Sequence, residues 1–418
     1  MLEVSKIFLN KKIIKYIFLV AIMFRFIYLN YMNWKYGYFT TGIPGVQYWL
    51  DSERYLLGAE SILNGTSIIG RGNQYFGYMI FIALIKFIGL PLEFVLIFQI
   101  IISIIAAFTL FNLAKYITGN SISGYVAISL YMLNPFINTW HTFILTESLY
   151  SSCVIFSCWA FYKVLKFRSY KYIIIFIIIL LSTIFIRPNG WIFLPIFICF
   201  FIFYSKLKRK VKISSVIIIF FSFIILANSI PTLQKAINVT TPIELMKKGE
   251  VIWGHPELRT EMPKEEIKNQ ENWSQGYKYI IKHPFACSKL AFLRVGNMFI
   301  QVRSHHSTIY KAHILLWIIP AYFLAFLGII KYRKSMIMRI FLAVIAGHAF
   351  IVALTYATHE SRFLIYILPL IYLLSGCGFI SVLQKVAPFL IKQKTSLKRI
   401  MYKKNNQDSS KNKDCNPF

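Results

Sequence analysis

The sequence predicts an all-α polytopic membrane protein, on the strength of its composition, its apolar runs and the placement of its charges. Of its 418 residues, 57% are hydrophobic and only 15% are charged, whereas soluble proteins carry about 25% charged residues. The apolar residues form Ile- and Phe-rich runs of about 20 residues, which can cross a hydrocarbon core of roughly 30 Å. The net charge of +30 falls mainly between these runs. We therefore attribute it to membrane topology and expect no nucleic-acid partner.

Ten apolar runs are predicted to span the membrane as helices, and an eleventh is shorter. The eleventh, Phe76–Gly89, ends in Gly89-Leu90-Pro91, so it is either another span or a helix lying in the outer leaflet. The ten predicted spans are Ile13–Tyr31, Leu92–Ala114, Ile122–Thr139, Leu145–Leu165, Tyr170–Ile186, Trp191–Tyr204, Ile213–Ile230, Ala312–Ile330, Ile337–Ala357 and Phe363–Leu383.

Basic residues decide between these two topologies, because cytoplasmic loops of membrane proteins are enriched in Lys and Arg. With ten spans and a cytoplasmic N-terminus, more than half of the 46 basic residues lie on the cytoplasmic side, where the acids are Glu3, Asp408 and Asp414. If Phe76–Gly89 spanned the membrane, the basic cluster Lys163–Lys171 would lie outside. We therefore predict that both termini are cytoplasmic and that Phe76–Gly89 is an embedded exterior helix.

The predicted topology divides the chain into four segments. Residues 1–230 form an N-terminal transmembrane module, in which the exterior loop 32–91 is the candidate catalytic loop. Residues 231–311 are mostly polar and are predicted to form an exterior loop or a small helical cap. Residues 312–384 hold the C-terminal transmembrane helices. Residues 385–418 are rich in Lys, then in Asn and Ser, and are predicted to form a basic, disordered cytoplasmic tail on anionic lipid.

Two acids are predicted at the exterior mouths of transmembrane helices, where an ionisable side chain is costly enough to suggest function. Asp51 follows the first span, in Leu50-Asp51-Ser52-Glu53-Arg54-Tyr55, and could alternatively be a solvated loop acid. Glu147 begins the fourth span, and it could alternatively be satisfied by a cap or by a neighbouring Arg. The predicted topology brings both acids to one face, which favours the functional interpretation.

Two arginines are predicted in the same exterior cavity. Arg187 ends the fifth span, and Arg362 precedes the last span in His359-Glu360-Ser361-Arg362. Arg presents a planar fork of donors that suits phosphate oxygens. Together with the two acids, this set describes a site for an anionic lipid head group, in which an acid acts as general base and the arginines stabilise a phosphate leaving group. The same set could form the substrate gate of a transporter.

Six short patterns occur in an order that resembles a known family. They are Asp51-Ser52-Glu53-Arg54-Tyr55, Gly77-Tyr78-Met79-Ile80-Phe81-Ile82-Ala83-Leu84, Asn134-Pro135 with Leu145-Thr146-Glu147-Ser148-Leu149-Tyr150, Ile186-Arg187-Pro188-Asn189-Gly190, Tyr279-Ile280-Ile281-Lys282-His283-Pro284, and Arg362-Phe363 with Leu368-Pro369. Over about Leu50–Gly378 the chain resembles the polytopic GT-C glycosyltransferases, in the branch related to protein O-mannosyltransferases and the lipid A aminoarabinose transferase.

The resemblance implies a GT-C-like fold with exterior juxtamembrane helices, and a mechanism. A sugar would be carried on a polyprenyl phosphate, and an acceptor hydroxyl would attack its anomeric carbon in one inverting displacement. By position, Asp51 would be the catalytic base, Glu147 the second acid, and Arg187 and Arg362 contacts to the phosphate. Further candidates for substrate binding are Glu53, Arg54, Tyr55, Tyr78, His141 and His359.

One departure from the family pattern bears on the acceptor. In the protein mannosyltransferases the two acids of the first exterior loop are adjacent, whereas here Ser52 separates Asp51 from Glu53. This favours modification of a glycolipid or surface glycan over modification of a protein. No cofactor is firmly predicted, although Asp51 and Glu53 could bind a divalent metal.

The sequence thus predicts a membrane glycosyltransferase with a polyprenyl-phosphate-linked donor, a hydroxyl acceptor and an exterior active site in the plasma membrane. Two alternatives stay open. One is a polysaccharide polymerase or ligase that uses diphosphate-linked donors. The other is a lipid-linked glycan transporter, which would be expected to contain an inverted repeat with broken helices at the bilayer midplane. The sequence contains no internal repeat of this kind.

Overall fold

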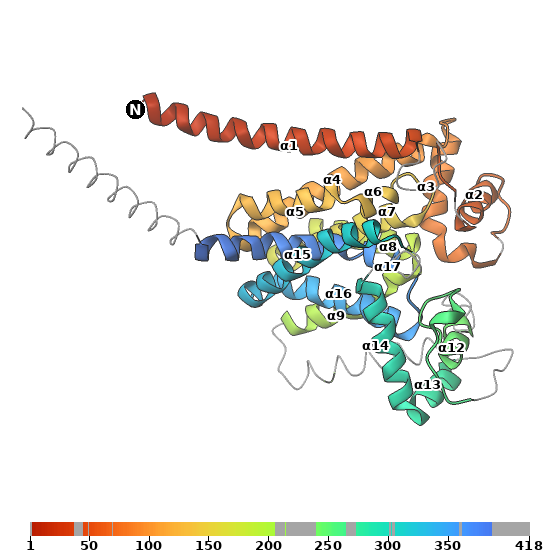
Figure 1. Cartoon of the computed structure of the whole chain (residues 1–418). Coiled ribbons are helices and arrows are strands. Elements are labelled where there is room, and N and C mark those ends of the chain that lie inside the picture. Colours follow the sequence, from red (N-terminus) through yellow and green to blue (C-terminus); the bar gives the residue numbers. More distant parts are fainter. Residues whose placement is uncertain are drawn as a thin grey trace, which may run out of the picture.

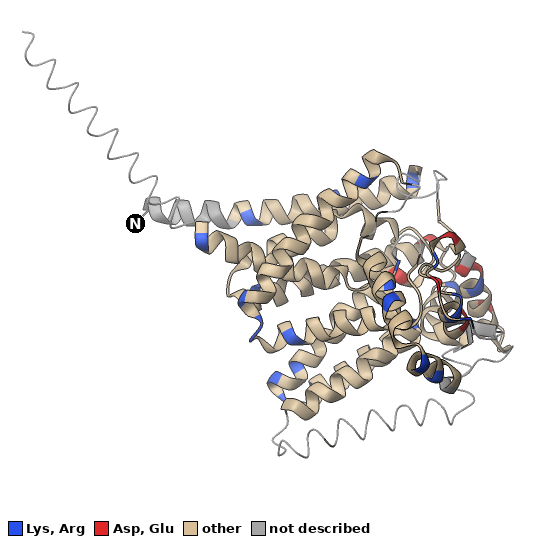
Figure 2. Ribbon diagram, turned by 60° about the horizontal axis from the view of Figure 1, so that its bottom comes forward, with Lys and Arg blue, Asp and Glu red and all other residues tan. Residues whose placement is uncertain are grey.

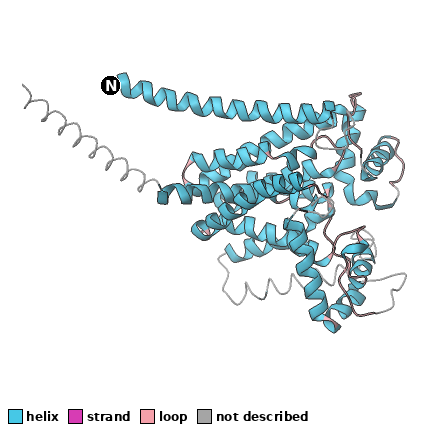
Figure 3. Cartoon of the chain, in the orientation of Figure 1, coloured by secondary structure: helices cyan, strands magenta, loops and turns pink. Residues whose placement is uncertain are grey.

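The computed structural model is a bundle of helices, and it confirms the predicted all-α class. It describes residues 2–36, 45–48, 50–68, 70–204, 214, 240–264, 273–300, 302, 306–358 and 362–386. Within these ranges β pairing is limited to isolated bridges, such as the parallel bridge between Gln47 and Phe143. Figure 3 shows helices joined by loops in this part of the chain.

Six described helices are long and apolar enough to span a membrane. They are α1 (Leu2–Tyr36), α4 (Glu93–Thr118), α7 (Thr146–Phe167), α15 (Thr308–Tyr332), α16 (Met336–Leu354) and the helix Leu368–Val386. Three more predicted spans are shorter apolar helices: α5 (Ser121–Leu133), α8 (Tyr170–Ile186), and the pair η2 (Pro188–Ile192) and α9 (Phe193–Tyr204). The predicted span Ile213–Ile230 lies outside the described residues apart from Ser214.

The long helices lie side by side, and the remaining short helices gather at one end of the bundle (Figure 1). This end holds α2 (Leu50–Leu63), α3 (Phe76–Phe87), α12 (Thr240–Lys247) and α13 (Trp273–Lys282). Figure 2 shows Lys and Arg at both ends, whereas Asp and Glu gather at the end with the short helices. The uneven distribution of charge along the sequence, from which the topology was predicted, therefore corresponds to an uneven distribution of acidic residues between the two ends of the structure.

The helix α3 corresponds to the predicted exterior helix Phe76–Gly89. Its 12 residues extend about 18 Å at 1.5 Å per residue, which is too short for a hydrocarbon core of roughly 30 Å. The helix ends before Gly89, which adopts φ +73°, and Pro91 follows. Its buried face packs on α2 through Met79, whose side chain occupies the space beside Gly58. Together α2 and α3 form one short layer at this end of the bundle.

Two predicted spans are divided in the structure, and proline explains both divisions. The run Ile122–Thr139 breaks at Asn134 into α5 and α6 (Pro135–Thr139). The residue before a proline avoids the helical region, and Asn134 adopts φ −69° and ψ 119° while its side chain accepts a hydrogen bond from the Ile137 amide. The run Phe363–Leu383 breaks into α17 (Arg362–Ile365), a turn, and the helix Leu368–Val386, whose second residue is Pro369.

Glycines allow α15 and the last helix to pack closely. A Cβ atom added at Gly378 would collide with the Leu324 carbonyl oxygen, and one added at Gly328 with the Leu374 carbonyl oxygen. Small residues at such positions let transmembrane helices pack backbone against backbone. This contact holds the C-terminal helix in the bundle.

We expect Gly378→Ala to lower the free energy of unfolding by about 1–3 kcal/mol, because the added methyl group must push two helix backbones apart. The thermal unfolding midpoint in detergent measures this effect. Gly296→Ala in α14 (Pro284–Ile300) is the matched control, since a Cβ there meets nothing within 4 Å. Equal midpoints for the two variants would show that the close contact does not contribute to stability.

The segment predicted as an exterior loop or cap contains helices at 240–247, 273–282 and 284–300, with turns and isolated bridges between 248 and 264, and it is fastened to the bundle. The fully buried Arg294 of α14 donates from Nε to the Glu250 carbonyl oxygen (3.0 Å) and from Nη1 to the Ala353 carbonyl oxygen (3.3 Å). The Trp253 amide donates to the Ala357 carbonyl oxygen (3.0 Å). The hydrogen bonds to Ala353 and Ala357 join the segment to the end of α16 and the residues that follow it, shortly before Arg362.

Candidate functional site

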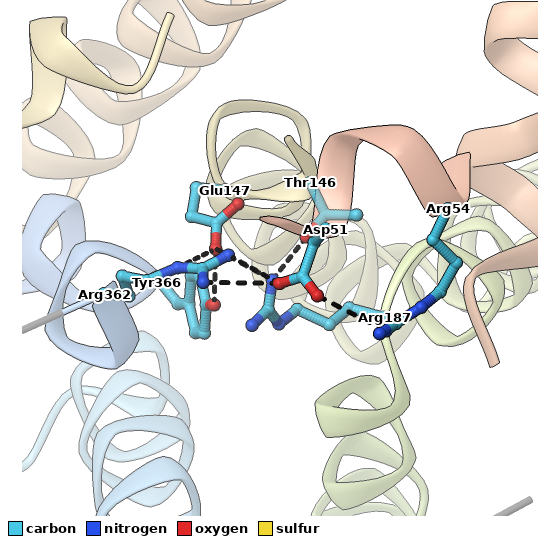
Figure 4. A network of polar contacts seen from close by, with 7 residues as sticks. All are labelled: Asp51, Arg54, Thr146, Glu147, Arg187, Arg362 and Tyr366. Carbon is cyan, nitrogen blue, oxygen red and sulfur yellow. Dashed lines mark hydrogen bonds and ion pairs between the residues drawn. The ribbon is translucent and has the colours of Figure 1, made fainter. Parts of the chain in front are cut away.

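Two acids and two arginines from four segments meet at the end of the bundle that carries the short helices (Figure 4). Asp51 lies in the first turn of α2 and Glu147 in the first turn of α7, while Arg187 follows α8 and Arg362 begins α17. Arg362 contacts both acids, 2.5 Å from Nη2 to Glu147 Oε1 and 3.4 Å from Nη1 to Asp51 Oδ2. The predicted convergence of these four residues is therefore present in the structure.

Glu147 is the centre of this network. Its side chain is fully buried, and Oε1 accepts hydrogen bonds from Arg362 Nε (2.7 Å), Arg187 Nη1 (3.0 Å) and the Tyr366 hydroxyl (3.4 Å). Arg187 also donates to the Thr146 hydroxyl. The first turn of α7 adds the positive end of a helix dipole. Glu147 thus serves as the buried counterion that holds both guanidinium groups in place.

Asp51 is the more accessible acid of the two. Its side chain is 26% exposed, whereas that of Glu147 is 0% exposed. Asp51 Oδ1 lies 3.3 Å from Arg54 Nη1, one helical turn later in α2. Of these two acids, Asp51 is therefore the one that a reactant can reach without displacing the core of the network.

Aromatic rings contact the guanidinium groups of the two arginines and limit their orientation. The Arg187 guanidinium lies over the rings of Tyr366 (4.7 Å) and Phe363 (5.8 Å), and that of Arg362 over Trp140 (5.5 Å). Such cation–π contacts favour one orientation of each guanidinium group. Burial alone would lower the pKa of Arg362, but the Glu147 carboxylate raises it, and the net shift is upward. Both arginines stay charged.

The conformation of the Arg187-Pro188-Asn189-Gly190 turn is explained by the residues that form it. Arg187 is extended (φ −155°, ψ 136°), as the residue before a proline prefers, and Pro188 begins η2. Gly190 packs against α8 so closely that a Cβ would lie 2.6 Å from the Thr183 carbonyl oxygen. The chain can therefore reverse within four residues and leave the Arg187 side chain pointing at Glu147.

A framework of buried polar side chains supports the candidate site. It was not predicted from the sequence. Gln99 of α4 accepts from the Tyr78 hydroxyl (3.0 Å) and donates to the His141 and Phe143 carbonyl oxygens (3.4 and 3.2 Å). From α1, Asn30 donates to Asn138 (2.9 Å). Polar side chains inside otherwise apolar spans indicate that such a framework exists, because each of them needs a hydrogen-bond partner. The sequence does not show which residues the partners are.

The structure separates the remaining candidates into buried and exposed groups. Tyr55 and Tyr78 are fully buried with their rings 5.2 Å apart, and burial raises the pKa of Tyr55 well above its usual range. Arg54 contacts Asp51 at the edge of the network, and Glu53 is exposed. His359 lies outside the described residues. Tyr78 holds the framework through its hydrogen bond to Gln99.

The proposed metal pair does not fit the helix that carries it. Asp51 and Glu53 are two residues apart in α2, and side chains at that spacing do not face each other on a helix. Asp51 is turned toward Arg362 and Arg54. Among the described residues, no group of three or more His, Cys, Asp or Glu side chains could hold a metal ion. A metal role for this pair therefore receives no support from the geometry.

His141 is buried beneath the site and is held by Ser148, whose hydroxyl lies 2.5 Å from Nδ1. Burial lowers the pKa of His141 to about 3, so the folded protein keeps it neutral at physiological pH.

We expect His141→Gln to flatten the acid dependence of stability. Below the ordinary histidine pKa of about 6.5 the unfolded chain binds a proton that the folded chain excludes until about pH 3. His141 therefore lowers the free energy of unfolding by about 1.4 kcal/mol for each pH unit below 6.5. Thermal unfolding midpoints from pH 7.5 to 4.5 measure the slope, and equal slopes in parent and variant would contradict this assignment.

The comparisons with known proteins give one match. Residues 76–233 match the family model described as dolichyl-phosphate-mannose-protein mannosyltransferase. No curated protein and no solved structure matches the chain. The matched segment contains Tyr78, His141, Glu147 and Arg187, whereas Asp51 and Arg362 lie outside it.

This match bears out the resemblance to this family over the part of the chain that holds three of the six motifs, those of the ranges 77–84, 134–150 and 186–190. The family that it resembles is one of membrane glycosyltransferases, and the apolar helices indicate a multi-pass membrane protein. Over residues 76–233, less than half of the chain, the sequence is similar to the dolichyl-phosphate-mannose-protein mannosyltransferase family, a member of the GT-C superfamily.

Proposed function

We propose that the protein is an inverting glycosyltransferase, which moves a sugar from a polyprenyl-phosphate-linked donor to an acceptor hydroxyl on the exterior face of the membrane. The observation that carries this proposal is the network of Asp51, Glu147, Arg187 and Arg362, in which an accessible carboxylate lies beside two ordered guanidinium groups. The family match supports a polyprenyl-phosphate donor.

The charge of the site suits a phosphodiester donor. Two carboxylates, from Asp51 and Glu147, face three guanidinium groups, from Arg54, Arg187 and Arg362. One positive charge is therefore in excess, and a sugar linked to a lipid through a single phosphate carries one negative charge. Arg187 and Arg362 would hold that phosphate, because guanidinium groups bind phosphate oxygens in a bidentate geometry.

Asp51 would act as the general base. The acceptor oxygen attacks the anomeric carbon, its proton passes to an Asp51 carboxylate oxygen, and the bond between the anomeric carbon and the phosphate oxygen breaks. The electron pair of that bond stays on the polyprenyl phosphate, whose growing negative charge the two arginines stabilise. Attack opposite the leaving group inverts the anomeric centre.

The exterior placement of this reaction rests on charge. The end of the bundle that holds the network carries Asp and Glu as well as Lys and Arg, whereas the charged residues seen at the opposite end are Lys and Arg (Figure 2). Because basic residues favour the cytoplasmic side, the network would face outward. Its hydroxyl acceptor would then be a glycolipid, a surface glycan or a protein.

Mass spectrometry of the lipid product tests the proposal. We expect the purified full-length chain, given polyprenyl-phosphate-mannose, to release polyprenyl monophosphate and to add mannose to an acceptor. Turnover of a diphosphate-linked donor alone, with release of polyprenyl diphosphate, would instead support a polymerase or ligase. Movement of an intact lipid-linked glycan across vesicles without cleavage would support a transporter.

A further inference from the structure

An exposed tryptophan stands beside the site on the segment that precedes α13. Trp253 is 53% exposed. Ligand sites are lined mainly by apolar and aromatic side chains, with a few polar groups that fix the orientation of the ligand. The catalytic network just described makes no use of Trp253.

The backbone holds Trp253 in a fixed position. Its amide donates to the Ala357 carbonyl oxygen (3.0 Å), and the Ala357 amide donates to the Val251 carbonyl oxygen (2.9 Å). Gly254 follows at φ +78°, where glycine is favoured, and Arg259 pairs with Glu250 at 2.6 Å. The exposed indole is therefore carried by a turn whose backbone is held by these hydrogen bonds. Such an ordered backbone lowers the conformational entropy that the protein loses when the indole binds a ligand.

A row of aromatic rings leads from Trp253 to the catalytic arginine. The Trp253 and Tyr356 ring centroids are 6.3 Å apart with planes 33° apart, so the two rings are neither closely stacked nor edge-on. Tyr356 contacts Phe363 (5.9 Å), and Phe363 lies under the Arg187 guanidinium (5.8 Å). Trp253 thus lies within three consecutive contacts of Arg187.

We propose that Trp253 and Tyr356 form an acceptor subsite for a saccharide, an inference that rests on the proposed transferase function. A sugar ring has an apolar C–H face that packs on an aromatic plane and hydroxyl groups that remain free for polar partners. His255 and Glu257, paired at 2.5 Å, supply such partners on the same turn. Because Tyr356 and Phe363 separate Trp253 from Arg187, a single sugar would not reach both Trp253 and Asp51. The acceptor is therefore an oligosaccharide.

The subsite belongs to the acceptor and not to the donor. The donor phosphate is assigned to Arg187 and Arg362, and its lipid tail must remain in the bilayer. Trp253 instead lies on the polar segment outside the bundle, next to the end of α16. A ligand that contacts Trp253 therefore approaches from the aqueous side, as an acceptor does.

Binding of α-mannotriose to the full-length chain in detergent tests the subsite without any donor. Calorimetry should show that Trp253→Ala raises the Kd at least tenfold, whereas Trp253→Phe raises it less than threefold because an aromatic face remains. Leu258→Ala is the matched control: Leu258 is 39% exposed on the same turn, and we expect an unchanged Kd. Thermal unfolding checks that each variant is folded.

A kinetic measurement separates this inference from the proposed function. With polyprenyl-phosphate-mannose as donor, Trp253→Ala should raise the KM for mannotriose at least tenfold and leave the KM for the donor within twofold. Parental Kd values in Trp253→Ala, or no mannotriose binding by the parent chain, would overturn the subsite. Transfer to a hydroxyl-bearing peptide with the same dependence on Trp253 would also overturn its saccharide specificity. Failure to cleave any donor would count against the proposed function alone, since the binding measurement would still decide the subsite.

Discussion

We expect Asp51→Asn to lower sugar transfer by about 10²–10⁴-fold while the protein stays folded and inserted. An amide of the same shape cannot accept the acceptor proton, and a positioned general base contributes a factor of this size. Stability should change by less than about 1 kcal/mol, because Asp51 is partly exposed and its ion pairs measure 3.3 and 3.4 Å. Transfer to acceptor at saturating donor, with the thermal unfolding midpoint recorded in parallel, measures both effects.

Glu60→Gln is the matched control for this variant. Glu60 lies on the same helix, and its exposed carboxylate pairs with Lys86 at 2.7 Å, away from the network. Its removal should leave transfer within twofold of the parent, since exposed ion pairs contribute little. Undiminished transfer by Asp51→Asn would remove Asp51 as the base, and Glu147, which is fully buried, could not take its place without a rearrangement of α7.

Much of the fold could be predicted from the sequence, because a bilayer imposes one dominant rule. Apolar runs of sufficient length become helices, and Pro91, Pro135 and Pro369 lie at the places where those helices begin or break. The divisions of the runs Ile122–Thr139 and Phe363–Leu383 were not predicted. Their causes are Pro135 and Pro369, but mean hydropathy is averaged over a window and does not register the break that a single proline produces.

The charged members of the site could be predicted for a related reason. An ionisable residue at a helix mouth is conspicuous against an apolar background, so Asp51, Glu147, Arg187 and Arg362 could be singled out by position alone. The supporting residues could not be, because their roles depend on pairings across the bundle. Tyr366 looks like any aromatic in a span, yet it donates to Glu147 and lies against Arg187.

Loss of Glu147 should be the most destabilising single change in the site. Glu147→Gln leaves Arg187 and Arg362 close together and almost fully enclosed, without the carboxylate that both of them contact. Removing one partner of a buried ion pair costs about 3–5 kcal/mol, because an uncompensated charge stays behind. We therefore expect a marked fall in the thermal unfolding midpoint together with a loss of transfer, in contrast to Asp51→Asn, which should lose transfer alone.

The double variant Glu147→Gln with Arg187→Gln shows whether the charge is the cause. Removing the second charge should recover part of the lost stability, and a coupling energy of about 1–3 kcal/mol is expected for groups in direct contact. Glu93→Gln is the matched control, since Glu93 also lies in the first turn of a long helix but is exposed. An unfolding midpoint for Glu147→Gln equal to that of Glu93→Gln would mean that Arg187 and Arg362 do not depend on this carboxylate. The division of roles between a buried structural acid and an accessible catalytic one would then have to be abandoned.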